Sequence, residues 1–139
     1  MKFSVYSLYR AWTFQLASSL MKSNNLDYLV TSYPKFRTKK YGISNRHVKS
    51  FIILLILQNL FTKFNSFLNK LNLNWQYIKI LDWLTDFFYS FFISKDSNFL
   101  IVGFGNSACR IIKKAKTKKI KTIYYLNICS DSFKYKTLI

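Results

Sequence analysis

The residues best placed for chemistry are Gly103-Phe104-Gly105-Asn106-Ser107, which end an apolar run and precede a basic helical pattern. Two glycines one residue apart favour a tight turn, and the Asn or Ser can cap the helix that follows. The spacing is part of the G-x-G-x-x-G fingerprint of dinucleotide-binding proteins, with Ala108 at the third glycine position. Without a dinucleotide, the same turn opens a helix N-terminus that can receive an anion or a sugar hydroxyl.

The dinucleotide interpretation needs a second residue that the sequence does not supply in the usual place. A full fingerprint has an acid at the end of the next strand, about 20 residues on, which binds the ribose. The next strand of this chain ends in Tyr125-Leu126-Asn127, and the first acid after it is Asp131. An NAD-type domain therefore stays an alternative, and no cofactor is predicted.

The remaining reactive side chains are too scattered to predict a catalytic or metal site. Cys109 and Cys129 make neither a disulfide framework nor, with a single His47, a metal site. We expect Cys109 to be a small buried side chain in a reduced, cytoplasmic protein. Asp82 and Asp86 follow Lys79 at helical spacing and predict structural pairing across one turn.

The elements that would position the glycine turn form a β-strand, helix, β-strand unit. Residues 99–102 are a short apolar run, residues 108–119 carry an apolar stripe at helical spacing, and residues 120–126 are β-branched and aromatic. The same pattern occurs in residues 2–31, with a strand at 2–8, a helix at 10–22 and a strand at 26–31. Such units place their strands in parallel. We therefore predict one α/β domain over residues 1–139.

The middle of the chain differs in character. Pro34 ends the second strand, and residues 35–49 read as a basic loop. This loop is either a solvated surface or a surface for phosphates and anionic headgroups, through Lys35, Arg37, Lys39 and Lys40. Two helices are predicted next, at about 50–71 and 75–92.

Both helices are predicted to carry an apolar stripe at helical spacing, and the stripe of the second is expected to face inward. The first stripe contains Leu57, Leu60, Phe61, Phe64, Leu68 and Leu71, and the second contains Ile78, Leu81, Leu84 or Thr85, Phe88 and Phe91. The pair carries more aromatic residues than one covering layer needs. That surplus predicts an exposed face that meets a membrane surface or an absent partner domain, and we prefer the membrane.

The charge balance predicts a polyanionic binding partner. The chain has 22 Lys and Arg against five Asp and no Glu, which gives a net charge of +17. Nucleic acid, an anionic membrane face or phosphorylated substrates would complement this positive charge. A coding preference for Lys, Asn, Ile, Phe and Tyr would produce the same excess without any function. No secretory signal is evident, and the longest apolar run, 51–57, is far below the ~20 residues of a membrane-spanning helix.

The order of these segments resembles the N-terminal half of GT-B glycosyltransferases of the group-1 or family-4 class. The likeness is carried by Ala11–Leu20 with Asn25-Leu26-Asp27, by Thr31-Ser32-Tyr33-Pro34-Lys35, by Val102–Ser107 with Lys113-Lys114-Ala115-Lys116, and by Lys121-Thr122-Ile123. It covers nearly the whole chain. There are two departures: Cys129-Ser130-Asp131 stands where bacterial relatives often carry a His, and the paired glutamates of the donor domain are absent.

The resemblance implies a Rossmann-like parallel sheet with flanking helices, which is the acceptor-side half of the GT-B architecture. It implies transfer of a sugar from a nucleotide-sugar, bound by a second domain outside this chain, to a glycan or lipid-linked acceptor. The chain alone is then a truncated transferase without turnover, cytoplasmic or peripheral on the cytoplasmic membrane face. The acceptor would contact Gly103, Gly105, Asn106 and Ser107, with Asp131 as a candidate general base.

A different class of function is a basic, non-enzymatic module that binds nucleic acid or a membrane surface. Nucleic-acid modules interleave aromatic and basic residues on a sheet face or groove. In this chain the aromatic residues cluster on the helix pair, which disfavours nucleic acid.

Overall fold

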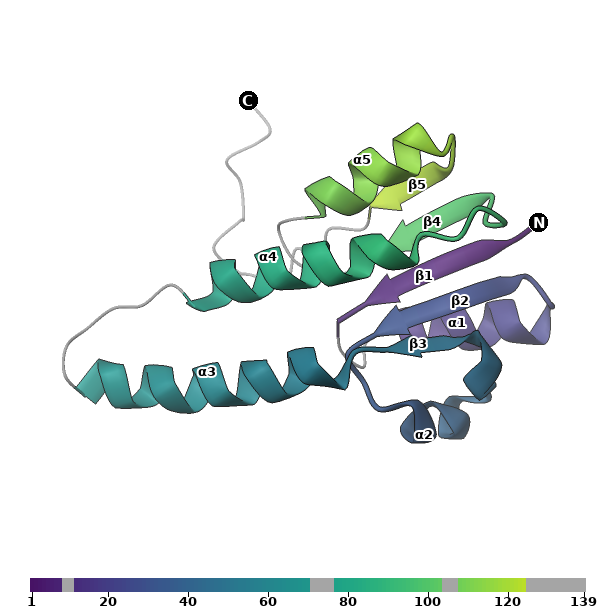
Figure 1. The fold of residues 1–139 in the computed structure, drawn as a ribbon. Coiled ribbons are helices and arrows are strands. Elements are labelled where there is room, and N and C mark those ends of the chain that lie inside the picture. The colour runs from purple at the N-terminus through teal and green to yellow at the C-terminus, as the bar shows by residue number, and fades with distance from the viewer. Residues whose placement is uncertain (9–11, 71–76, 104–107, 125–139) are drawn as a thin grey trace, which may run out of the picture.

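The computed structural model describes residues 1–8, 12–70, 77–103 and 108–124, and these residues form a parallel α/β sheet with helices on both faces (Figure 1). The five strands of the described residues lie in the order β3-β2-β1-β4-β5, and every neighbouring pair is parallel. The strands are β1 (Phe3–Ser7), β2 (Leu26–Thr31), β3 (Val48–Ser50), β4 (Phe99–Val102) and β5 (Lys121–Tyr124). The predicted α/β, Rossmann-like arrangement is confirmed.

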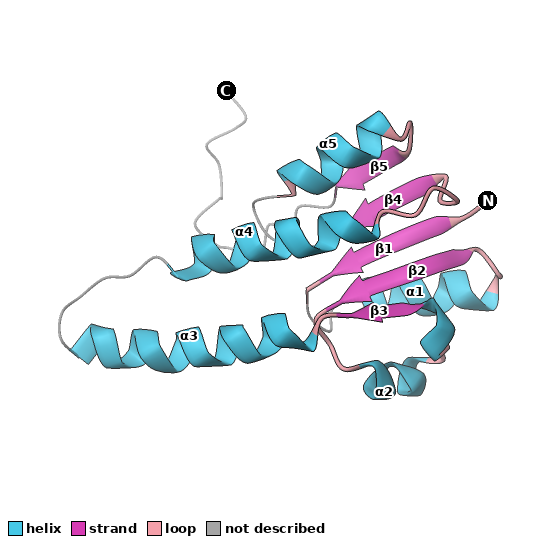
Figure 2. Cartoon of the chain, viewed as in Figure 1, coloured by secondary structure: helices cyan, strands magenta, loops and turns pink. Residues whose placement is uncertain are grey.

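The helices divide between the two faces of the sheet (Figure 2). The α-helices are α1 (Trp12–Lys22), α2 (Lys35–Thr38), α3 (Ile52–Lys70), α4 (Tyr77–Tyr89) and α5 (Cys109–Thr117). Short 3-10 turns occur at η1 (Lys39–Tyr41), η2 (Asn45–His47) and η3 (Ser90–Phe92). Helix α1 packs on one face, whereas α4 and α5 pack on the other.

Two buried clusters follow from the alternation of side chains along the strands. On one face, Tyr6, Val30 and Val102 pack with α4 and with the predicted stripe of α5. In that stripe Ala108, Ile111 and Ala115 are buried, and Ile112 is half-buried. On the other face, Val5 packs against α1. Both faces are therefore covered, as parallel sheets require.

Residues 35–49 are not the loop that the sequence predicted. They form α2, η1 and η2, and residues 48–50 form β3, which pairs with β2 through Leu29 and Val48. The side chains of Ile43 and Val48 are almost fully buried. A three-residue strand is too short to show a periodicity of two, so the run of basic residues dominated the sequence pattern.

The two long helices are where the sequence predicted them, but their burial differs. Helix α3 projects beyond the strands alongside α4 (Figure 1), so the sheet cannot cover most of its length. Leu54 is buried, whereas Leu60 and Phe64, which belong to the predicted stripe, are at least half exposed. Phe91 follows α4 and is also exposed rather than inward. Leu57, Phe61 and Leu68 of the predicted stripe are half-buried, and Leu71 lies outside the described residues, so the stripe is only partly covered.

Helix α5 begins on a carboxylate supplied by α4. The N-cap residue, Ala108, has no side-chain cap, and the Asp86 carboxylate accepts hydrogen bonds from the backbone N–H groups of Arg110 (2.8 Å) and Ile111 (3.1 Å). Asp86 is almost fully buried. A buried carboxylate at a helix N-terminus satisfies free N–H groups and complements the helix dipole. Asp86 therefore joins α4 to α5.

We expect Asp86→Ala to destabilise the fold, because it leaves two N–H groups, one of them buried, without their acceptor. The expected loss is about 2 kcal/mol of unfolding free energy, measured by urea denaturation. Asp96→Ala removes an exposed carboxylate and should change the unfolding free energy little. Equal losses in the two variants would contradict the capping role of Asp86.

Candidate functional site

The carboxyl ends of β1 and β4 form the switch point of the sheet. These two strands are neighbours, and the chain leaves them toward opposite faces, into α1 from β1 and into α5 from β4. Parallel sheets of this kind bind ligands in the crevice outside the carboxyl ends of the strands at such a point. The glycine turn singled out in the sequence begins at this point, at the end of β4.

Buried polar side chains tie the chain together at this edge. The Thr13 hydroxyl of α1 donates to Ser7 Oγ at the end of β1 (2.6 Å). The Ser32 hydroxyl donates to the carbonyl oxygen of Leu8. The Tyr89 hydroxyl of α4 donates to the carbonyl oxygen of Ser7 (3.3 Å). These bonds hold the ends of β1 and β2 against α1 and α4. The three hydroxyl groups therefore position the chain and are not assigned a role in reaction chemistry.

Gly103 lies at this edge, as the sequence predicted, and is in close contact with α1. Its N–H donates to the carbonyl oxygen of Tyr6 (2.9 Å). A Cβ atom at this position would lie 2.3 Å from Thr13 Cγ2, well inside the normal contact distance. Glycine is therefore required for the approach of β4 to the first turn of α1.

The other predicted contacts of an acceptor lie outside the described residues. Gly105, Asn106 and Ser107 fall in 104–107, and Asp131 falls in 125–139. Their roles stay predictions.

Asp86 changes the electrostatics of this edge. The sequence predicted that the start of α5 could receive an anion, but the N–H groups of Arg110 and Ile111 are already bound to the Asp86 carboxylate. A second anion beside this carboxylate would be repelled. Sequence reasoning missed this because Asp86 lies 24 residues before Arg110, with no local capping signal near α5.

The predicted anion-contacting residues are solvent-exposed. Lys35, Arg37, Lys39 and Lys40 lie on α2 and η1, where Phe36 between them is 66% exposed. Contact of these residues with anions stays a prediction. Lys40 also lines a cavity of about 520 Å³ between η1 and α1, together with Ser18 and Lys22.

The other titratable groups are engaged in the structure or exposed. His47 Nδ1 lies 2.8 Å from the carbonyl oxygen of Asp27, which ties the ring to β2. Burial, and then the nearby Asp27 carboxylate, raises the pKa of Tyr6 far above its usual value, so its hydroxyl stays neutral and donates to the carbonyl oxygen of Phe92. The prediction that Cys109 is buried is wrong. Its side chain is exposed, because the buried stripe of α5 passes through Ala108 and Ile111.

Comparisons with protein-family models, curated proteins and solved structures give no significant match to this chain. Within the described ranges, no three His, Cys, Asp or Glu side chains gather in a group that could hold a metal ion. No helix in the same ranges has both the length and the hydropathy to cross a bilayer.

We expect Gly103→Ala to cost about 1–3 kcal/mol of unfolding free energy, which is typical of overpacking. Thr13→Ser removes the clashing methyl group and keeps the hydroxyl that bonds Ser7. In the Thr13→Ser background, Gly103→Ala should therefore cost much less, and thermal denaturation of the four proteins measures this coupling. Additive effects would show that the contact with Thr13 is not the reason for the glycine.

Proposed function

We propose that this chain is the acceptor-binding half of a glycosyltransferase of the GT-B architecture. The observation that carries the proposal is topological. The strand order puts the switch point between β1 and β4, next to the glycine turn that resembles the acceptor side of that family. In this proposal the nucleotide-sugar is held by a second domain, and the chain by itself has no turnover.

The chemistry of the edge favours a neutral part of the acceptor. Asp86 is bound at the start of α5, so an acceptor phosphate would be repelled there, whereas a sugar hydroxyl would not. The acceptor is then a glycan or lipid-linked sugar that presents a hydroxyl near Gly103, with its charged or lipid portion directed away from the edge.

The test is an amide NMR titration of the chain with a polyprenyl diphosphate-linked monosaccharide in micelles. We expect shifts at the carboxyl edge, in Leu8, Thr13, Gly103 and Ala108. The same polyprenyl diphosphate without the sugar is the control and should leave this edge unchanged. Equal shifts with and without the sugar, or shifts induced there only by a single-stranded oligonucleotide, would contradict the acceptor site.

A second function, attachment to an anionic membrane surface, is favoured by the outward face of α3. Its exposed large apolar residues recur along one arc of the helix: Ile52, Ile53, Ile56, Leu60, Phe64 and Phe67 are each at least 43% exposed. Lys63 and Lys70 lie on the same helix, and α3 has no acidic residue. Apolar residues flanked by lysines are typical of helices that lie in the membrane interface.

Helix α4 contributes less to this surface than the sequence suggested, because α5 uses part of its aromatic face. The Arg110 guanidinium lies over the rings of Trp83 (4.7 Å) and Phe87 (5.2 Å), and Lys114 Nζ lies over Phe91 (4.7 Å). These cation–π contacts hold α5 on α4. We therefore assign membrane attachment to α3.

Co-sedimentation with lipid vesicles tests this assignment. The chain should bind vesicles that contain phosphatidylglycerol more strongly than pure phosphatidylcholine vesicles, and high salt should weaken the binding. Ile56→Ser/Leu60→Ser should lower the affinity by about tenfold or more, because apolar area leaves the interface. Ile123→Ser removes an exposed apolar residue from β5, at the far side of the sheet, and should have no effect. Equal losses in both variants would contradict attachment through α3.

A further inference from the structure

A basic cavity lies at the edge of the sheet opposite the switch point. It has a volume of about 650 Å³ and is formed where β1, β4 and β5 begin. Four lysines line it: Lys95, Lys118, Lys119 and Lys121. We propose that this cavity binds a small anion that carries two or more phosphate groups. The proposal is independent of the glycosyltransferase assignment, which concerns the other edge.

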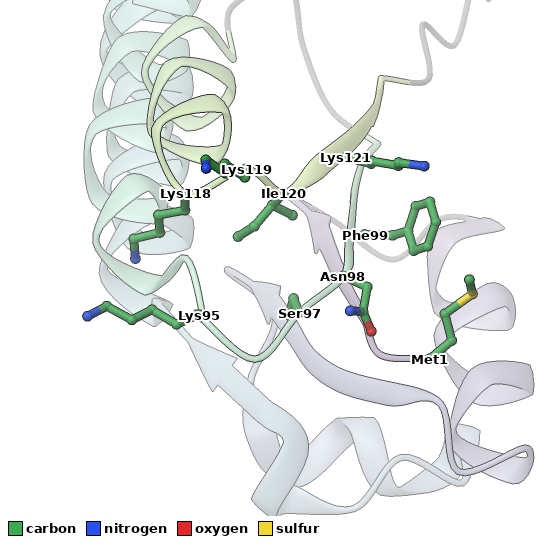
Figure 3. A pocket seen from close by; sticks show the side chains of 9 residues that line it. All are labelled: Met1, Lys95, Ser97, Asn98, Phe99, Lys118, Lys119, Ile120 and Lys121. Atoms are coloured by element: carbon green, nitrogen blue, oxygen red, sulfur yellow. The ribbon is translucent and has the colours of Figure 1, made fainter.

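The lysine side chains extend outward from the cavity lining on two sides (Figure 3). Lys95 and Lys118 extend on one side and Lys121 extends on the other, beside the Phe99 ring, while Ser97, Asn98 and Ile120 lie between them. Lys118 Nζ donates to the carbonyl oxygen of Ile93 (2.5 Å), and Lys121 Nζ lies 5.8 Å from the centre of the Phe99 ring. These contacts hold two of the ammonium groups at the rim.

The acids near the cavity leave its positive charge in excess. The lining residues include no carboxylate. Asp27, on β2, accepts a hydrogen bond from the Ser97 hydroxyl (2.5 Å), and Asp96 is an exposed neighbour of Lys95 in the chain. An anion in the cavity would therefore face four ammonium groups and two nearby carboxylates.

Lys119 adds a fourth cation at a position where glycine is the usual residue. Helix α5 ends with hydrogen bonds from the N–H of Ile120 to Ala115 O (2.9 Å) and from the N–H of Lys119 to Lys116 O (3.0 Å). This closing motif needs a residue in the left-handed region, and Lys119 has a φ of +57°. A lysine at such a position is disfavoured by its backbone. The hydrogen bonds also occupy carbonyl oxygens that would otherwise repel an anion.

Size and charge together define the class of ligand. A volume of about 650 Å³ is in the range of small-molecule sites. Each ion pair at an exposed site is weak in water, so a monophosphate would gain little, whereas a diphosphate carries more charge and can contact more than one lysine. Inorganic diphosphate and nucleoside diphosphates both contain a diphosphate group. The proposal is that the cavity binds this shared group.

Isothermal titration of the chain with inorganic diphosphate, ADP and inorganic phosphate tests the proposal. We expect diphosphate and ADP to bind at least tenfold more tightly than phosphate. Tighter binding of ADP than of diphosphate would identify a nucleoside diphosphate as the ligand, and similar affinities would identify the diphosphate group alone. Equal affinities of phosphate and diphosphate would overturn the proposal.

The variant Lys119→Gly distinguishes an effect on diphosphate binding from an effect on stability. Because glycine favours the left-handed conformation, this variant should unfold at a higher temperature, yet its Kd for diphosphate should rise at least threefold. Asn24→Gly is the matched control. Asn24 has a φ of +55° in the same kind of turn after α1, so its replacement should not lower stability or alter the Kd. An unchanged Kd in Lys119→Gly would overturn the proposal.

A charge-matched pair of variants tests whether the net charge alone attracts the anion. Lys95→Ser/Lys121→Ser and Lys79→Ser/Lys113→Ser each remove two positive charges from exposed side chains, but only the first pair lines the cavity. The Kd for diphosphate should rise about tenfold in the first variant and stay within about twofold in the second. Equal rises in the Kd for diphosphate in the two variants would overturn the site and assign the binding to the overall charge.

Discussion

The structure depends on the burial of β1 between β2 and β4. Residues 4–7 of β1 have no exposed surface, yet three of them, Ser4, Tyr6 and Ser7, carry hydroxyl groups. Buried hydroxyls need hydrogen-bond partners, and each one finds its partner on a different part of the chain. Ser4 bonds Ser97 before β4, Tyr6 bonds the carbonyl oxygen of Phe92 in η3, and Ser7 bonds Thr13 in α1. These bonds place the elements on both sides of the sheet relative to one strand.

Local patterns predicted the elements whose boundaries are marked in the sequence. The strands at 26–31 and 99–102 have the predicted limits, because each is a mostly apolar or β-branched segment next to a turn residue, Asn25 or Gly103. Strand β3 has three residues and one buried apolar side chain, Val48, so no periodicity could reveal it. The length of α3 was predictable, but its exposure was not, because a sequence does not show how far a sheet extends beneath a helix.

The candidate site shows the same division between local and long-range information. Gly103 was predictable as a turn residue, whereas the reason for a glycine there is the methyl group of Thr13, on a helix about 90 residues earlier in the chain. The capping of α5 by Asp86 was not predictable. The local N-cap residue is Ala108, and the carboxylate comes from the helix before β4. Helix α4 has two aspartates, Asp82 and Asp86, and nothing near Asp86 in the sequence marks its partner on α5.

Asp86 also reverses the usual expectation for where an anion binds on a parallel sheet. In many α/β proteins, the free N–H groups of a helix at the carboxyl edge receive a phosphate. In this protein two of those N–H groups on α5 are bound to a carboxylate, and the lysine cavity lies at the amino edge, where α5 ends. In the proposed assignments the two edges therefore differ, with a neutral hydroxyl bound at the carboxyl edge and a diphosphate at the amino edge. Because α5 connects the two edges, the carboxylate at its start and the lysines at its end both complement its dipole. The same pattern of charges that stabilises this helix thus directs anions away from the switch point.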